Sequence, residues 1–332
     1  MRLLVIGGTS FIGRHTVEMA LAAGHEVTVF HRGSKQDDPF PEAEHVHGDR
    51  DGGLAPLRGR NWDAFLDTCG YLPRVVQASS ELLADRVAFA LYVSSLSVYD
   101  PARAPAPPLG KDAPLATMDD PTVEEITETT YGPLKALCEE AFRAAFTDRA
   151  AIVRPTYVVG PFDPTDRFTY WVRRIGEGGI VLAPGPRDAP FQAIDVRDLA
   201  AFQLHVLETA TTGVFNGVGP ATPITFEDFL GTCIDGTGAS AELSWVDPEH
   251  LLRAGLAYGE ELPLWDPPAD YPVMRADPAR ALMEGLRLRP LVETVAATAA
   301  WDRDRGKTPM SRFLDRDREA ELVDTWRARS AG

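Results

Sequence analysis

The stretch LLVIGGTSFIG at residues 3–13 decides the fold that the rest of the chain must complete. Four apolar residues precede a glycine-rich turn, and apolar positions then recur at helical spacing through Leu21, which indicates a buried strand, a tight turn and a helix. Gly7 suits the unusual backbone angles of the turn, and Gly8 and Gly13 allow close approach of the main chain. Because free N–H groups at a helix start bind anions, the stretch predicts a pyrophosphate site.

The residues that follow complete a larger unit. The helix ends at Gly24, and residues 26–30, EVTVF, alternate as a second strand. A glycine triplet also occurs in ordinary turns, so the triplet alone is weak evidence. The second strand supplies the β-α-β unit that a dinucleotide site requires.

Composition limits the classes of protein. With 332 residues, 44% of them hydrophobic and 25% charged, the chain can bury the core of one large or two coupled domains. We find no apolar run long enough for a bilayer and no signal peptide before residue 3, so we expect a cytoplasmic protein. The net charge of −16 argues against nucleic acid or an anionic membrane as partner. Cys69, Cys138 and Cys233 form no CxxC pair, which argues against a disulfide framework or a zinc ribbon.

The end of the second strand bears on the choice of nucleotide. Residues 31–35 read HRGSK, with no carboxylate to accept from a ribose 2′-hydroxyl and with two cations, Arg32 and Lys35. An arginine here accommodates a 2′-phosphate, so the sequence favours NADP(H), with NAD(H) as the alternative. The plain alternative is that Arg32 is a solvated turn residue.

Strands and helices then alternate. A third short strand contains His45 and His47 on one face, but zinc needs further ligands and we predict no metal site. Asp49 follows at the carboxyl end, where a carboxylate can hold the adenine amino group. A strand at 63–67 and a helix from residue 74 to about residue 87 come next. This order predicts a doubly wound parallel sheet.

The next strand, at residues 89–93, delivers SSLSVY (residues 94–99) to the ligand-binding edge of the sheet. After a proline-rich loop over 101–121, Tyr131 and Lys135 lie four residues apart at the head of an amphipathic helix, a spacing that is also common on solvated helices. A nearby ammonium favours the ionised form of a phenol. Tyr131 could therefore exchange a proton with a substrate oxygen that a serine hydroxyl also holds.

Together these motifs resemble the extended short-chain dehydrogenase/reductases, also called the NAD-dependent epimerase/dehydratase family. The resemblance also covers the segments IVRP at 152–155 and IDVRDLA at 194–200. It implies a Rossmann-type fold, Ser95 as the catalytic serine, Tyr131 as the acid/base, and Lys135 as the residue that binds the nicotinamide ribose and tunes Tyr131. The residues expected to contact the cofactor are Gly7, Thr9, Ser10, Phe11, Ile12, Gly13, His31, Arg32, Asp49, Arg50, Cys69, Gly70, Tyr131, Lys135 and Pro155.

The departures from the family pattern are informative. Ser10 replaces a usual glycine, and its small side chain should preserve binding. Leu96 and Ser97 stand where dehydratases of the family carry acidic residues, which argues against dehydratase chemistry. The segment at 189–193, APFQA, lacks the arginine with which nucleotide-sugar epimerases hold a diphosphate. Unless Arg187 or Arg275 substitutes, a nucleotide sugar is disfavoured as substrate.

The domain organisation follows from the same pattern. We predict a dinucleotide-binding domain from residues 1–160 and about 186–222, and a smaller, mostly helical substrate domain from about 161–185 and 223–332. Within them the pattern predicts a strand at 214–218 and helices at 167–175, 196–208, 226–234, 248–254, 278–284, 291–302 and 312–329.

Three functions stay open. The first is an oxidoreductase that transfers a hydride to or from a carbonyl or alcohol carbon of a small molecule, with exchanging NADP(H). The second is a sugar or nucleotide-sugar epimerase that retains NAD. The third is a nucleotide-sensing or RNA-associated relative without turnover, which the intact Ser95, Tyr131 and Lys135 disfavour. The sequence leaves the substrate and direction of reaction open, together with the choice between a monomer and a homodimer formed through the Tyr131 helix.

Overall fold

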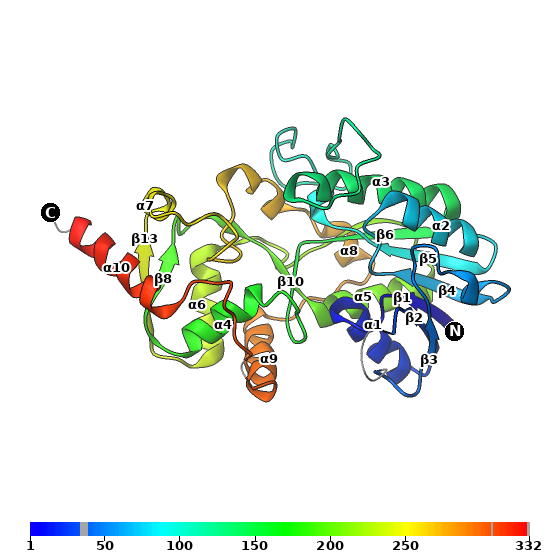
Figure 1. Cartoon of the computed structure of the whole chain (residues 1–332), viewed down its shortest axis with the longest axis horizontal. Coiled ribbons are helices and arrows are strands. Elements are labelled where there is room, and N and C mark those ends of the chain that lie inside the picture. Colours follow the sequence, from blue (N-terminus) through cyan, green and yellow to red (C-terminus); the bar gives the residue numbers. More distant parts are fainter. Residues whose placement is uncertain (34–38, 307, 331–332) are drawn as a thin grey trace.

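The computed structural model describes residues 1–33, 39–306 and 308–330. A parallel sheet of seven strands has the order β11-β6-β5-β4-β1-β2-β3 (Figure 1). From β1 the chain steps outward to β2 and β3 and then crosses back to β4, so the strand order reverses beside β1, where α/β sheets bind ligands. The strands are β1 (Arg2–Ile6), β2 (Glu26–His31), β3 (Glu44–His47), β4 (Trp62–Asp67), β5 (Val87–Val93), β6 (Ala150–Pro155) and β11 (Gly213–Gly217).

Helices cover both faces of this sheet. Successive strand side chains point to opposite faces, so Leu3 and Val5 pack with α1 (Phe11–Ala22) and α5 (Val196–Thr209). Leu4 and Ile6 pack on the other face, which α2 (Pro73–Leu83) and α3 (Glu128–Phe146) cover. Burial on both faces explains why the strands read as nearly continuous apolar runs. The predicted doubly wound, Rossmann-type sheet is confirmed.

A separate apolar cluster forms the second lobe, which we define by α4, β8, α6, β13, α7, α9 and α10 and which lies at the left in Figure 1. Its core includes Trp171, Phe191, Phe229 and Trp265. The bounds are α4 (Arg167–Gly176), β8 (Gly179–Pro184), α6 (Phe226–Thr237), β13 (Ala241–Val246), α7 (Pro248–Arg253), α9 (Leu291–Asp304) and α10 (Arg316–Ser330). The short helix α8 (Ala279–Met283) contacts β11 of the central sheet.

Three small two-stranded sheets complete the fold. Parallel pairs join β7 (Tyr157–Val159) with β10 (Ala193–Asp195), and β8 with β13. An antiparallel pair joins β9 (Pro190–Phe191) with β12 (Ile224–Thr225). Short 3-10 turns occur at 55–57, 96–98, 268–270 and 273–275.

Some predicted elements need correction. The helix predicted from residue 74 to about 87 ends at Leu83, because the chain must turn before β5 begins at Val87. The tail helix begins at Arg316 rather than 312. The region predicted as mostly helical also contains β8 and β13, a strand pair that the sequence did not predict. The predicted domain boundaries stay a prediction. Within the described ranges, we find no helix that is both long and apolar enough to cross a membrane.

Candidate active site

The turn between β1 and α1 is built around two glycines. Gly7 has φ +94°, and a Cβ added there would lie 2.5 Å from Oγ1 of Thr68. A Cβ on Gly13 would lie 2.3 Å from the carbonyl oxygen of Gly7. These positions leave no space for a larger side chain. The first turn of α1 therefore packs directly against the end of β1.

The start of α1 leaves its first amides available to a ligand. Ser10 is the N-cap residue, and its side chain makes no capping hydrogen bond to any residue that the structure describes. The first N–H groups of a helix have no partners inside the helix, and the helix dipole there favours an anion. A pyrophosphate therefore fits the segment that holds the predicted contacts Thr9, Ser10, Phe11, Ile12 and Gly13.

Three imidazoles meet where β2 ends. His31 Nε2 lies 2.9 Å from His45 Nδ1, and the ring centroids of His31 and His47 are 4.8 Å apart. Arg32 is exposed and forms no ion pair with the described part of the chain. The other predicted cation, Lys35, lies outside the described residues. Among the residues described, we find no group of three or more His, Cys, Asp or Glu side chains arranged to hold a metal ion.

Asp49 and Arg50 follow β3, but their side chains have different surroundings. The exposed Asp49 carboxylate accepts a hydrogen bond from the Asp51 amide at 2.9 Å. Arg50 makes a bidentate pair with the buried Asp67, with N–O distances of 2.8 and 2.7 Å, and also contacts Ser79. Both terminal nitrogens of Arg50 are thus committed to protein groups. Contact of Asp49 and Arg50 with a cofactor stays a prediction.

Three further predicted contacts lie at the same carboxyl edge. Cys69 packs against the Gly7 turn, and burial raises the pKa of its thiol. The carbonyl oxygen of Gly70 accepts from the Tyr92 hydroxyl at 2.8 Å and from Lys135 Nζ at 2.9 Å. Pro155 ends β6 beside Gly217 of β11. These residues frame the end of the sheet next to the glycine turn.

Ser95 and Tyr131 meet at this edge. Ser95 follows β5 and caps the turn at 96–98, since its Oγ accepts from the Ser97 amide at 3.1 Å. Tyr131 lies in the first turn of α3, which begins with a capping box formed by Thr127 and Thr130. Burial raises the pKa of Tyr131, and a hydrogen bond with Ser95 opposes that rise. Two hydroxyl groups therefore lie close enough to bind one ligand oxygen between them.

Lys135 is buried one turn further along α3. Its Nζ donates to the carbonyl oxygens of Gly70 at 2.9 Å and Val93 at 2.7 Å, and it lies 4.4 Å from the centroid of the Tyr92 ring. Burial lowers the pKa of Lys135 to about 8. The ammonium thus joins the segment after β4 to the end of β5, one turn of α3 beyond Tyr131. Its predicted role toward a nicotinamide ribose stays a prediction.

Four residues beside this site were missed at the sequence level. Tyr71 is 44% exposed, and its ring centroid lies 5.3 Å from Lys135 Nζ. Arg167, at the start of α4, lies 4.9 Å from the Tyr157 ring centroid and acts electrostatically on Tyr131. The Tyr157 hydroxyl donates to Asp266 at 2.5 Å. A tyrosine two residues beyond the family segment at 152–155 was the one local signal available.

The family model described as "NAD dependent epimerase/dehydratase family" matches residues 3–54 and 60–217. The chain belongs to the NAD-dependent epimerase/dehydratase family. The curated "Epimerase family protein SDR39U1" of Bos taurus is 28% identical over 256 residues, 70% of this chain and 81% of that protein. "Chloroplast stem-loop binding protein of 41 kDa b" of Arabidopsis thaliana is 26% identical over 256 residues, and the aligned part spans 71% of this chain and 63% of that protein.

Solved structures of similar proteins show the same fold. WbmH of Bordetella bronchiseptica, solved in complex with NAD⁺, has a TM-score of 0.67 at 17% identity, covering 92% of this chain and 99% of its own. Human SDR39U1 (isoform 2), solved with NADPH, has a TM-score of 0.63 at 22% identity, covering 90% and 99%. Members of the NAD-dependent epimerase/dehydratase family with this fold thus include proteins solved with either nucleotide.

This member of the NAD-dependent epimerase/dehydratase family uses the segment before β10 for packing. Gln192 is fully buried, accepts from the Ala276 amide at 2.9 Å and donates to the Ala276 carbonyl at 3.1 Å. Phe191 stacks on Phe229 with centroids 4.2 Å apart. Arg187, the candidate substitute for a phosphate-binding arginine, pairs with Glu227 at 3.2 Å. The segment therefore joins the second-lobe core to residues 273–276.

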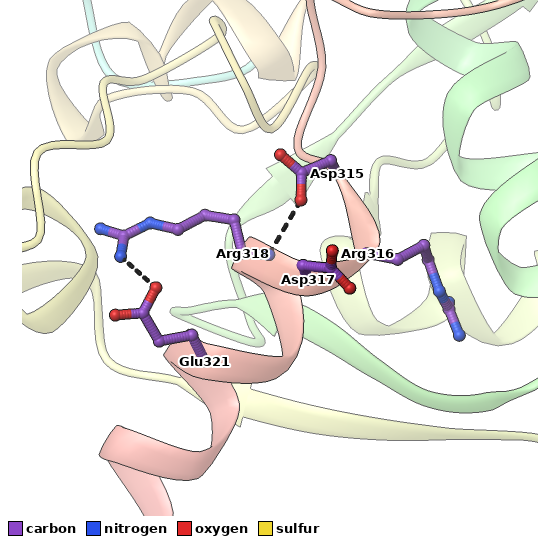
Figure 2. Close-up of a pocket in the computed structure, with 5 residues that line it drawn as sticks. All are labelled: Asp315, Arg316, Asp317, Arg318 and Glu321. Atoms are coloured by element: carbon purple, nitrogen blue, oxygen red, sulfur yellow. Dashed lines mark hydrogen bonds and ion pairs between the residues drawn. The ribbon is translucent and has the colours of Figure 1, made fainter.

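Two surface hollows lie away from the site. One, at the start of α10, is lined by charges that pair with each other, since Arg318 contacts Glu321 at 2.6 Å and its amide donates to Asp315 at 2.9 Å (Figure 2). The other is a more apolar groove between loop residues 115–121 and the outer face of α3, including Leu137. A homodimer through α3 stays a prediction.

Proposed function

We propose that this chain is an NADP(H)-dependent oxidoreductase that interconverts a carbonyl and an alcohol on a small molecule, with Tyr131 as the acid/base. The observation that carries the proposal is the Ser95–Tyr131 hydroxyl pair at the same sheet edge as the glycine turn. Hydroxyl groups that converge on one oxygen can donate hydrogen bonds to it as negative charge develops there. We expect the protein to act in the cytoplasm and to bind a small molecule rather than nucleic acid or a membrane.

The residues around the glycine turn fit a dinucleotide. The open start of α1 suits the pyrophosphate, and the exposed Arg32, without an ion-pair partner in the described ranges, suits a 2′-phosphate. When bound, the nicotinamide supplies the hydride to a carbonyl carbon or accepts it from an alcohol carbon. NAD(H) is the alternative cofactor, because the similar solved structures include complexes with NAD and with NADPH.

The protonation state of Tyr131 favours carbonyl reduction. Burial raises the pKa of its phenol, so the group holds its proton at neutral pH. A protonated phenol can donate to the oxygen that gains negative charge, while Ser95 donates a second hydrogen bond. We therefore expect reduction to be constant through neutral pH and to decline on the alkaline side, where Tyr131 loses its proton.

The epimerase alternative rests on structural neighbours such as the UDP-glucuronic acid 4-epimerase of Bacillus cereus, whose TM-score is 0.66 at 15% identity. An observation against it is that Gln192, in the segment where nucleotide-sugar epimerases carry a diphosphate-binding arginine, is hydrogen-bonded to the backbone of Ala276. The RNA-associated alternative rests on the name of the Arabidopsis relative. A net charge of −16 opposes binding to a phosphate backbone.

Two measurements test the proposal. The nucleotide released on denaturing the undialysed protein is identified by mass spectrometry, and retained stoichiometric NAD⁺ would favour the epimerase. NADPH oxidation is then screened with aldehydes and ketones for the wild type, Tyr131→Phe and the control Tyr258→Phe. Tyr131→Phe should lose about 10²–10⁴-fold in turnover. Its affinity for NADPH should stay within about threefold of the wild type, because most of the expected NADPH contacts lie around the glycine turn and Arg32. Full turnover by Tyr131→Phe would refute the assigned role.

A further inference from the structure

Arg167 carries a guanidinium that no acidic side chain in the described part of the chain contacts directly. It forms no ion pair with the residues described here, and its one side-chain hydrogen bond runs from Nε to Thr165 Oγ1 at 3.2 Å. Its side chain is only partly buried. By contrast Arg173 and Arg174, both nearly two turns further along α4, are bonded to Asp302 and Glu319 respectively. The two terminal nitrogens of Arg167 are therefore available to a ligand.

The position of this guanidinium is defined by its neighbours. It lies 4.9 Å from the ring centroid of Tyr157, which holds it as a cation on an aromatic face. Pro155 ends β6, and Tyr157 follows two residues later. β6 pairs with β5, the strand that precedes Ser95. Arg167 and Tyr131 are near enough to interact electrostatically. The open cation thus packs on Tyr157, just beyond the end of β6, within electrostatic range of the proposed proton donor.

Acidic side chains surround this arginine at longer range. Asp163 is buried and bonded to Thr165 at 2.7 Å, and Asp266 accepts from Tyr157. Asp270, next to Asp266 on the same loop, lies near Glu128 at the start of α3. The surroundings thus supply several negative charges against one open cation. A second acidic charge on a ligand would be repelled.

A second observation concerns Tyr271, which like Arg167 lies within electrostatic range of Asp266. The hydroxyl oxygen of Tyr271 is buried and has no hydrogen-bond partner in the described part of the chain. Burial, with smaller contributions from Tyr258 and Asp266, raises the pKa of Tyr271 to about 12. A buried hydroxyl without a partner costs free energy unless a ligand or water satisfies it.

We propose that Arg167 binds a carboxylate of the substrate, so that the substrate is a carbonyl or alcohol compound that also carries one carboxylate. The inference rests on the proposed function, since it places this group beside the oxygen that Ser95 and Tyr131 hold. A guanidinium presents paired N–H donors that match the two oxygens of a carboxylate. One arginine amid aspartates suits a monoanion better than a diphosphate.

The test uses the full-length protein loaded with NADPH and three probes of one ring size, namely benzoate, benzamide and phenyl phosphate. Aromatic probes suit this site because the ring of Tyr157 lies against the Arg167 guanidinium. Binding is measured by calorimetry for the wild type, Arg167→Met, Arg167→Lys and the control Arg60→Met. Arg60 also lies over an aromatic ring, that of Trp62 at 5.3 Å, but it pairs with Glu44 and precedes β4, at the amino ends of the strands and away from the site.

The expected result is that benzoate binds more tightly than benzamide and phenyl phosphate. Arg167→Met should weaken benzoate about tenfold or more and Arg167→Lys by less, because lysine keeps the charge and loses the paired donors. Arg60→Met should bind as the wild type does. Unfolding temperatures confirm that each variant is folded. The proposal is overturned if benzoate fails to bind, if phenyl phosphate binds more tightly, or if folded Arg167→Met keeps wild-type affinity for benzoate.

NADPH affinity, measured in the same samples, separates this inference from the proposed function. If the protein binds NADPH tightly but its benzoate binding does not depend on Arg167, the carboxylate site is refuted and the proposed oxidoreductase function is retained. Arg167-dependent benzoate binding in a protein that does not bind NADPH removes the oxidoreductase instead.

Discussion

Asp266 is the residue whose surroundings most directly predict a dependence on pH. Burial raises the pKa of its carboxyl to about 6, although the hydrogen bond from Tyr157 and the charge of Arg167 oppose the rise. The unfolded chain loses this proton near pH 4. Between about pH 4 and pH 6 the native state therefore holds the extra proton, and the free energy of unfolding falls as pH rises through that window.

Asp266→Asn removes this penalty and keeps an oxygen that can accept from Tyr157. We expect the variant to match the wild type near pH 4 and to exceed it by about 1–3 kcal/mol in free energy of unfolding above pH 6. Urea unfolding at both pH values measures the difference. Asp119→Asn, in the exposed loop before α3, is the matched control and should change little. An Asp266→Asn protein no more stable than the wild type at pH 8 would contradict the assigned burial.

Individual site residues differed in how far the sequence could predict them. Ser95, Tyr131 and Lys135 were predicted as catalytic residues from a strand end and one turn of helix, and their roles stay a prediction. The structure relates Tyr131 to Ser95 and puts Lys135 on the carbonyl of Val93. Arg50 was predicted to contact the cofactor, but local sequence carries no sign that Asp67 occupies both its terminal nitrogens. Arg167 escaped prediction because tertiary packing, not spacing, brings it to Tyr131.

At the scale of elements, α4 is held in place by the chain's last segments. Asp166, its N-cap, adopts φ +56°, a left-handed conformation that is strained for a residue with a side chain. Arg305 bonds the Asp166 carboxylate at 2.6 Å and Asp302 at 2.8 Å. Arg312 donates to the carbonyl of Thr165. These contacts fix the turn from which Arg167 starts α4.

Arg305→Met should release that turn. We expect a loss of about 1–2 kcal/mol in free energy of unfolding, because Asp166 loses its cation while Asp302 keeps Arg173. Benzoate binding by the NADPH-loaded protein should weaken about threefold or more as Arg167 loses its fixed position. Calorimetry and urea unfolding measure both effects. Arg253→Met, which breaks the exposed pair with Glu249, should change stability by less than about 0.5 kcal/mol. Unchanged benzoate affinity in Arg305→Met would show that the turn does not position Arg167.

The elements themselves were predicted unevenly, for a physical reason. The strands of the central sheet are buried on both faces and read as apolar runs, so the sequence located them within a few residues. β8 and β13 pair across about sixty residues. The apolar residues 180–183 of β8 lie between glycines and Pro184 and so resemble part of a Gly- and Pro-rich loop, and the partly exposed β13 carries no such run. Long-range pairing of short, half-exposed strands leaves too weak a local pattern to detect.

At the scale of the whole molecule, the two lobes have separate apolar cores. Two apolar clusters cover the two faces of the central sheet, and a third cluster fills the second lobe. Inside the second lobe, Glu319 of α10 accepts from Arg174 Nε at 2.7 Å and from the Leu182 amide at 2.9 Å. Both charged side chains are 4% exposed. This buried pair ties α10 to α4 and β8.

Glu319→Gln tests whether the two lobes unfold separately. Loss of one charge leaves Arg174 buried without its counterion, which should cost about 3 kcal/mol. Glu321→Gln, which alters an exposed pair with Arg318 on the same helix, is the control and should cost less than about 0.5 kcal/mol. Hydrogen exchange in Glu319→Gln should accelerate for amides of β8 and α10, while β1 and β5 keep wild-type protection, because separate cores open as separate units. Equal acceleration in β1 and β5 would mean that the lobes unfold as one cooperative unit, and the predicted division into two domains would then fail.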